Sequence, residues 1–215
     1  MDKDIINKIM KNLEMFNKKN TSTHIFIESF EFLKIRKDTW LSRVVFIFAS
    51  LVIAGIGAYQ GNSMLIAEEL VKTFLSIILA FAAIVFTGYV FMQVLITDRL
   101  LVAMMINGEK EENKLYETDL YFVKVMMFQL SCLILNLFIL AFLIILPEKG
   151  VIYSTDIIYK TIIGVIIAAV LYYNLIGIWE IKSLVFNVRQ LFNLHTYTRV
   201  VDIFDKQKGI TSKQE

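Results

Sequence analysis

The chain has 215 residues, 57% of them apolar, and its mean hydropathy is +0.62. This composition is too apolar for an ordinary soluble domain of this length. The formal net charge is only +2, so we expect no direct binding of nucleic acid.

The first 43 residues are polar and mixed in charge, and the first long apolar run starts too late for a cleavable signal peptide. Residues 5–16 place Ile, Leu and Phe side chains on one face, which predicts an amphipathic helix. The following stretch, "HIFIESFEFLKIRKD", fits either a helix or a strand, and we favour a helix at the cytoplasmic face of a membrane. We therefore expect residues 1–43 to be cytoplasmic or interfacial.

Long runs without Asp, Glu, Lys or Arg dominate the rest of the chain. About 20 residues suffice for a helix to cross about 30 Å of hydrocarbon. "LILNLFILAFLII" also lacks the alternation of a membrane β-barrel. The sequence therefore predicts an all-α membrane protein, with a four-helix bundle over residues 44–181 and a cytoplasmic C-terminal helix with a frayed tail over 182–215. The predicted spans are about 44–60, 73–97, 125–147 and 161–179, with a cytoplasmic loop at 97–124.

The positive charges predict the orientation of these spans. Nine Lys or Arg residues precede the first span, four lie in the 97–124 loop and six follow the last span, while the opposite side holds only Lys72, Lys149 and Lys160. By the positive-inside rule, both termini and the middle loop are cytoplasmic. The protein is then a multi-pass protein of the cell's inner, or plasma, membrane, and the lipid bilayer is its first partner.

Two segments of similar sequence suggest an internal repeat. "KTFLSIILAFAA" begins at Lys72 and "KTIIGVIIAAVL" at Lys160, and their threonines are expected to open the second and fourth spans. The stretches "DTWLSR" and "DLYFVK", which lead into the first and third predicted spans, also resemble each other. A tandem repeat of two hairpins and a chance match of apolar runs both fit.

A few polar residues fall inside the predicted spans. Ser50, Gln93, Gln129 and Asn174 are expected at similar depth near the cytoplasmic boundary, while Asn136 lies deeper and needs a partner in the bundle or in another subunit. We favour hydrogen bonds between helices as the role of this polar layer. The alternative is a constriction that lines a pore.

The first span also carries small residues at close spacing: Ser50, Ala54, Gly57 and Ala58. Small side chains let helix backbones approach closely. Packing within the chain is the favoured use of this face, and dimerisation is the other. We also expect a homo-oligomer.

The sequence gives no sign of a catalytic centre. The predicted spans contain no Asp, Glu, Lys or Arg, which argues against proton relays and transport of charged substrates. His24 and His195 are far apart in sequence, and Cys132 is the only cysteine. We therefore predict no catalytic, metal-binding or cofactor-binding residue and no enzymatic activity.

The predicted cytoplasmic segments carry apolar stripes that could dock a soluble protein. The candidate docking residues are Leu101, Met104, Met105, Val188, Phe192, His195 and Arg199. The favoured function is a non-enzymatic membrane scaffold or sensor that oligomerises and recruits a cytoplasmic protein. The alternatives are an oligomeric pore or membrane-perturbing effector, and a small membrane enzyme or transporter.

The layout, with "TDRLLVAMMING" after the second span and "NLHTYTRVVDIF" after the fourth, resembles small four-span membrane subunits of bacterial antiphage defence systems. The membrane component of the Kiwa system is one such subunit. The resemblance covers the overall plan and carries over no functional residue. It implies a membrane-anchored sensor or effector that works with a cytoplasmic protein.

Overall fold

The computed structural model describes residues 21–35, 37, 39–60, 63–97, 114–145 and 156–211, without the side chains of 114, 115, 156 and 202–211. The predicted amphipathic helix at 5–16 and the docking candidates Leu101, Met104 and Met105 lie outside these residues.

The elements in the described ranges are all helical. In chain order they are α2 (Ser22–Ser29), the 3₁₀ helix η1 (Phe30–Leu33), α3 (Trp40–Tyr59), α4 (Ser63–Leu95), α6 (Lys114–Ile145) and α7 (Asp156–Thr211). Four of them, α3, α4, α6 and α7, are long and apolar enough to cross a membrane. The prediction of an all-helical chain with four such helices is confirmed at this level.

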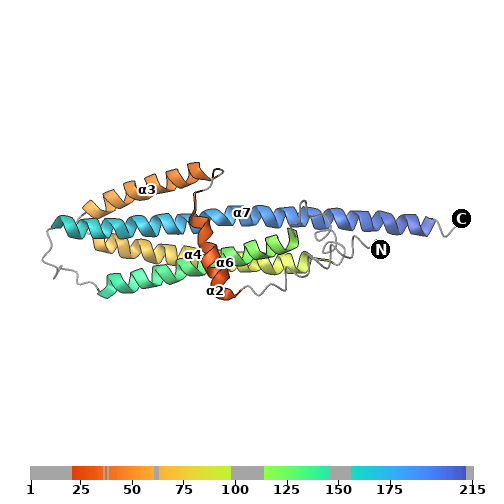
Figure 1. Ribbon diagram of the computed structural model, residues 1–215, viewed down its shortest axis with the longest axis horizontal. Helices are drawn as coiled ribbons and strands as arrows, with labels where there is room; N and C mark the ends of the chain where they lie inside the picture. Colours follow the sequence, from red (N-terminus) through yellow and green to blue (C-terminus); the bar gives the residue numbers. More distant parts are fainter. Residues whose placement is uncertain are drawn as a thin grey trace.

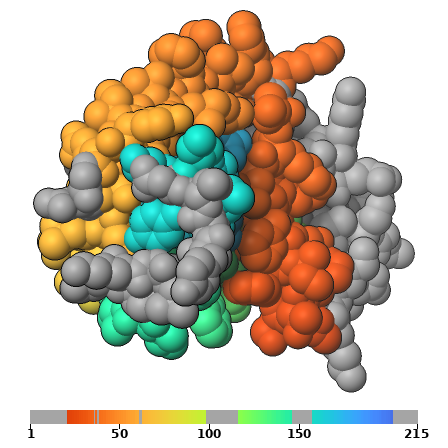
Figure 2. Space-filling view, turned by 90° about the vertical axis from the view of Figure 1, so that its left-hand side faces the viewer, coloured from red at the N-terminus to blue at the C-terminus, as the bar shows by residue number. Residues whose placement is uncertain are grey.

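The four long helices form a bundle in which α3 and α6 run opposite to α4 and α7 (Figure 1). We name the two ends of the bundle after the first and last residues of α3, the Trp40 end and the Tyr59 end. Figure 2 views the molecule from the Tyr59 end, with α3 and α4 along one side and α6 below α7. Beyond the Trp40 end, α7 extends further than the other long helices (Figure 1).

The segment that fitted either a helix or a strand is helical as far as Leu33. Thr21 caps α2, because its Oγ1 accepts a hydrogen bond of 3.3 Å from the backbone N–H of His24. α2 lies across the bundle at the level where α3 begins (Figure 1). Glu28 of α2 pairs with Lys124 of α6 at 2.9 Å, which fastens α2 to the bundle.

α4 begins at Ser63, about ten residues before the predicted start at Thr73. Lys72 and Thr73 therefore lie well inside this helix, whereas Lys160 and Thr161 lie in the first turns of α7. The helix that holds the second predicted span therefore does not begin at Thr73. Ala67 and Val71 are buried in the bundle, and this packing explains the earlier start.

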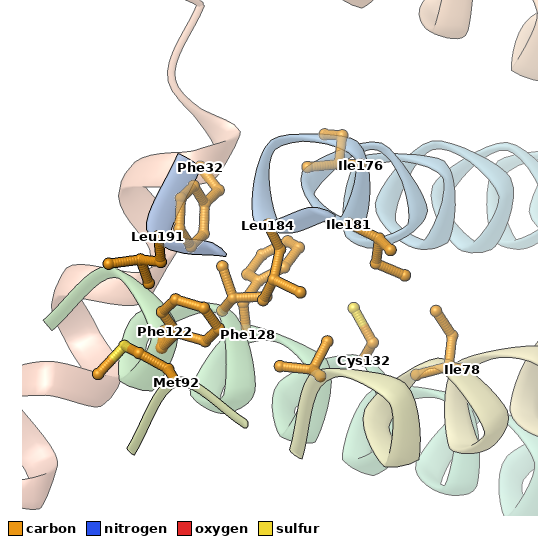
Figure 3. Packing of buried hydrophobic residues seen from close by; sticks show 12 residues of the cluster. Phe32, Ile78, Met92, Phe122, Phe128, Cys132, Ile176, Ile181, Leu184 and Leu191 are labelled. Atoms are coloured by element: carbon orange, nitrogen blue, oxygen red, sulfur yellow. The ribbon is translucent and has the colours of Figure 1, made fainter. Parts of the chain in front are cut away.

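Two apolar clusters fill the bundle, one toward each end. The cluster toward the Trp40 end includes Phe122 and Phe128 of α6, which face Leu184 and Leu191 of α7 (Figure 3). Cys132 is buried in the same cluster. The cluster toward the Tyr59 end joins α3, α4, α6 and α7, and its members are Ala54, Ala67, Val71, Leu143, Ile163, Ile167, Val170 and Leu171.

The small residues of α3 are buried within the chain. Ser50, Ala54, Gly57 and Ala58 are the members of this face, and each is buried. A Cβ placed on Gly164 of α7 would lie 3.2 Å from the Cβ of Ala58, so the two helices pack in close contact here. This face of α3 is therefore occupied by α7.

Candidate functional site at the Trp40 end

A buried ion pair joins α3 to α7 at the Trp40 end. Arg43 Nη2 lies 3.0 Å from Glu180 Oε1, and the two side chains are 2% and 10% exposed. The same Nη2 donates a hydrogen bond of 2.7 Å to the carbonyl of Phe32 in η1. One guanidinium thus ties together the start of α3, the middle of α7 and the segment that follows α2.

The sequence of α7 explains why Glu180 points inward. Ile176 and Leu184 lie four residues on either side of it, and both are fully or almost fully buried. Residues at this spacing share one helical face, so Glu180 is carried on the face that α7 turns to the bundle. A carboxylate in such surroundings needs a charged partner, and Arg43 supplies it.

A second group of charges surrounds Lys124 of α6. Its Nζ lies 2.9 Å from Glu28 and 3.7 Å from Glu31, and Lys34 lies 3.2 Å from Glu31. Tyr121, one turn away on α6, donates its hydroxyl to the carbonyl of Glu180 at 3.4 Å. The two charged groups therefore adjoin one another and link five helical segments, α2, η1, α3, α6 and α7.

A cavity of about 380 Å³ lies among these side chains, with Thr39, Trp179 and Ser183 also in its wall. Arg43 Nε and Nη1 and Thr39 Oγ1 are buried without a hydrogen-bond partner among the described residues. These donors can bond to water or to another acceptor that enters the cavity.

The site is suited to holding helices together and to binding, because its ion pairs join side chains from different helices. Within the described ranges, no group of three or more His, Cys, Asp or Glu side chains could hold a metal ion.

An aromatic edge borders the cavity. The rings of Trp179 and Phe46 meet at 5.5 Å, and Lys182 Nζ lies 4.6 Å from the centre of the Trp179 ring. Lys182 is attracted to the electron-rich ring face. Trp40, at the start of α3, is exposed at the same end of the bundle.

Deeper in the bundle, two amides of the predicted polar set pair with each other. Asn136 Nδ2 donates to Asn174 Oδ1 at 2.7 Å, and Asn174 Nδ2 donates to Asn136 Oδ1 at 3.0 Å. Asn174 also donates to the carbonyl of Val170 at 2.7 Å. Asn136, for which the sequence required a partner, therefore has one inside its own chain.

The other predicted polar residues lie apart from this pair. Gln129 donates to the carbonyl of Gly177 at 3.4 Å, and its Oε1 is buried without a partner among the described residues. The Ser50 hydroxyl is also buried without such a partner. Gln93 lies on the exposed surface of α4. A further polar contact, Ser131 Oγ to Tyr173 Oη at 2.8 Å, is not in the predicted set.

The predicted docking residues on α7 divide into two pairs. Phe192 and Arg199 are exposed, whereas Val188 and His195 are half-buried. Sequence reasoning missed further exposed apolar residues on the same helix, because they lie beside the apolar stripe that the spacing suggested. They are Phe186, Tyr197 and Val200.

Arg43 and Glu180 were also missed as site residues. Each stands next to an uncharged run, where a charge ordinarily marks the edge of a span. Their pairing depends on the antiparallel contact of α3 and α7, which the local sequence does not encode.

Comparison with known proteins adds no assignment: no protein-family model, curated protein or solved structure matches this chain.

Proposed function

We propose that the chain is a multi-pass membrane protein, with the Trp40 end in the cytoplasm, that acts as a non-enzymatic scaffold or sensor. Four helices of sufficient length and hydropathy support insertion. Trp40 and Trp179 lie at one end of the bundle and Tyr59 and Tyr159 at the other, as aromatic residues do at the two membrane interfaces. Along α7, the separation of Tyr159 and Trp179 corresponds to about 30 Å, the thickness of the hydrocarbon core.

The observation that carries the proposal is the continuity of α7. This helix runs without interruption from Asp156 to Thr211, a length of about 84 Å. Its part beyond Glu180, here called the α7 extension, exposes Phe186, Phe192 and Tyr197. Leu184 and Leu191 of this extension still pack against α4 and α6, whereas its aromatic side chains are exposed on the other side of the helix. Exposed aromatic side chains of this kind favour a docking surface for a soluble protein.

The ion pair of Arg43 and Glu180 lies at the root of this extension. A stimulus that shifts α3 or α2 acts on the same guanidinium that holds α7. This arrangement supports coupling between the bundle and the extension. The resemblance in layout to four-span defence subunits fits a sensor that signals to a cytoplasmic protein.

The pore alternative has weaker support from the geometry. Asn174 and Gln129, on which that interpretation drew, form hydrogen bonds inside the chain. Their amides therefore serve the packing of α6 against α7.

The proposal can be tested by placing a photo-crosslinking amino acid at Phe186, Phe192 or Tyr197 of the full chain in intact cells. We expect all three positions to capture the same soluble polypeptide. Phe48 of α3 and Phe138 of α6 are exposed side chains within the bundle and serve as matched controls. They should capture no soluble protein, because lipid covers them.

A double variant, Phe186→Ser with Phe192→Ser, gives a second readout. The captured polypeptide should disappear from the membrane fraction, while the amount of the chain itself in that fraction stays the same. Equal capture at Phe48, or a polypeptide that stays on membranes with the double variant, contradicts recruitment by the α7 extension.

A further inference from the structure

α4 presents a group of charged side chains on its outer surface. Lys72 Nζ lies 2.7 Å from Glu68 and 3.4 Å from Glu69. The side chains of Lys72 and Glu69 are 47% and 64% exposed. The bundle therefore leaves charges of both signs uncovered on one helix.

These charges lie beside the most apolar part of the bundle. A Cβ placed on Gly57 of α3 would contact both Ile66 of α4 and Ile167 of α7, at 3.7 and 3.3 Å. Glu68 and Glu69 lie two and three residues after Ile66, less than one helical turn away, so they lie level with the uncharged stretches of α3 and α7. Counted from Ser63, Glu69 and Lys72 lie about 9 and 14 Å along α4.

Lipid is a poor environment for this group. Ionisable side chains at the depth of the hydrocarbon core are costly there, and they ordinarily face protein or water. The pairing of Lys72 with its two carboxylates lowers this cost but leaves a net negative charge on the face. The outer face of α4 therefore needs a polar or protein cover.

The same face continues as a stripe of small residues. Starting from Glu69, alternate steps of four and three residues reach Thr73, Ser76, Ala80, Ala83 and Thr87, and all of these are exposed. This is the spacing of a helix–helix seam, and small side chains allow close approach. The three hydroxyls donate to their own helix backbone at 2.8 to 3.1 Å, so they need no further acceptor.

We infer that the outer face of α4 is the contact surface for a second copy of this chain. Copies inserted in the same membrane have the same orientation, so two α4 helices meet in parallel about a two-fold axis. Residues at the centre of such a seam meet their own counterparts. Lys72 of one copy can then approach Glu69 of the partner subunit, and charge complementarity selects a second copy over lipid.

This inference rests on the membrane insertion proposed above and names the helix through which the protein oligomerises. That helix is α4, because the small-residue face of α3 is already covered by α7.

Disulfide crosslinking of the full chain in native membranes tests the inference. In a Cys132→Ala background, Ala80→Cys and Ala83→Cys place single cysteines in the centre of the stripe. Because a disulfide requires the two Cα atoms to lie within about 7 Å, both variants should form dimers under mild oxidation. Ile56 of α3 and Phe138 of α6 are also exposed, on other helices of the bundle. Ile56→Cys and Phe138→Cys should therefore remain monomeric.

Charge exchange provides a second arm. Lys72→Glu in the Ala80→Cys background should abolish the crosslinked dimer, and the double exchange Glu69→Lys with Lys72→Glu should restore it. Carbonate extraction separates the two proposals, since release of the chain from membranes overturns insertion itself. A chain that stays in the membrane but gives no dimer at 80 or 83, or equal dimer at 56 and 138, overturns the α4 interface alone.

Discussion

At the scale of single residues, the reciprocal pair of Asn136 and Asn174 is the main polar contact inside the bundle. Both side chains are fully buried, and each amide donates to the other. A hydrogen bond between helices in a membrane stabilises the fold by only about 0.6 kcal/mol on average, which is less than its burial suggests. The larger effect comes from leaving one amide without a partner.

Asn136→Ala should therefore lower the free energy of unfolding by about 1–2 kcal/mol, because Asn174 keeps a buried carbonyl without a donor. Denaturant titration of the detergent-solubilised chain, followed by circular dichroism, measures this loss. In the double variant with Asn174→Ala, the loss should be smaller than the sum of the two single losses. Asn193→Ala, at an exposed position of α7, serves as the control. Additive losses would contradict a pairwise contact.

The ion pair of Arg43 and Glu180 is a second contact that a single substitution can test. Glu180→Leu should lower the free energy of unfolding by about 3–5 kcal/mol, since it leaves the Arg43 charge buried and unpaired. Adding Arg43→Met should recover a substantial part of this loss, because two apolar side chains can replace a buried ion pair. The same unfolding titration measures both variants. The exposed side chain of Gln190 on α7 gives a control substitution, Gln190→Leu, and an equal loss there would contradict a special role for Glu180.

At the scale of the helices, the sequence predicts where all four long elements lie but not where each of them begins and ends. The uncharged runs at 44–60, 125–147 and 161–179 lie within α3, α6 and α7, apart from a few residues at the helix ends. The start of α4 was missed because Glu68, Glu69 and Lys72 resemble a polar loop when they are read without their mutual pairing. Hydropathy identifies the apolar part of each helix, whereas packing determines where the helix begins and its register against its neighbours.

The same limit applies to the site. Asn136 was predicted to need a partner, but the choice of Asn174 depends on the register of α6 against α7. Arg43 and Glu180 are separated by 137 residues, and no local pattern connects them. Sequence patterns identified the polar residues of the bundle, and the tertiary fold determines which of them meet.

The contact of α3 with α7 yields a prediction at this scale. Gly164→Val should lower the free energy of unfolding by about 1–3 kcal/mol, because the added methyl groups meet Ala58 and push the helices apart. Gly55→Val is the matched control, since a Cβ at Gly55 has no neighbour within 4 Å. Thermal unfolding followed by circular dichroism compares the two variants. Equal losses would show that the α3–α7 contact tolerates wider spacing than the structure has.

At the scale of the whole molecule, α7 belongs to two parts with different surroundings. Its first half packs against α3, α4 and α6. The α7 extension packs against α4 and α6 through Leu184 and Leu191, and it exposes aromatic side chains beyond the level where α3 begins (Figure 1). A continuous helix transmits displacement because its backbone hydrogen bonds resist bending. In the proposed function, this continuity is what connects the membrane bundle to its soluble partner.

Ser183→Pro tests this connection, because Ser183 lies just beyond Glu180 where the extension begins. Proline removes the backbone donor of residue 183 and its ring clashes with the carbonyl of Trp179, which kinks a helix at a cost of about 3 kcal/mol. Spin labels at Phe138 of α6 and Arg189 of α7, in a Cys132→Ala background, should give a narrow distance distribution in the parent chain and a broad or shifted one with proline. Capture of the soluble polypeptide at Phe192 should fall in parallel, while extraction behaviour stays that of the parent chain. Ser183→Ala keeps the helix intact and should change neither measurement. If proline broadens the distance distribution and capture persists, docking does not depend on the orientation of α7. The chain would then anchor the soluble polypeptide at the membrane without signalling to it through α7.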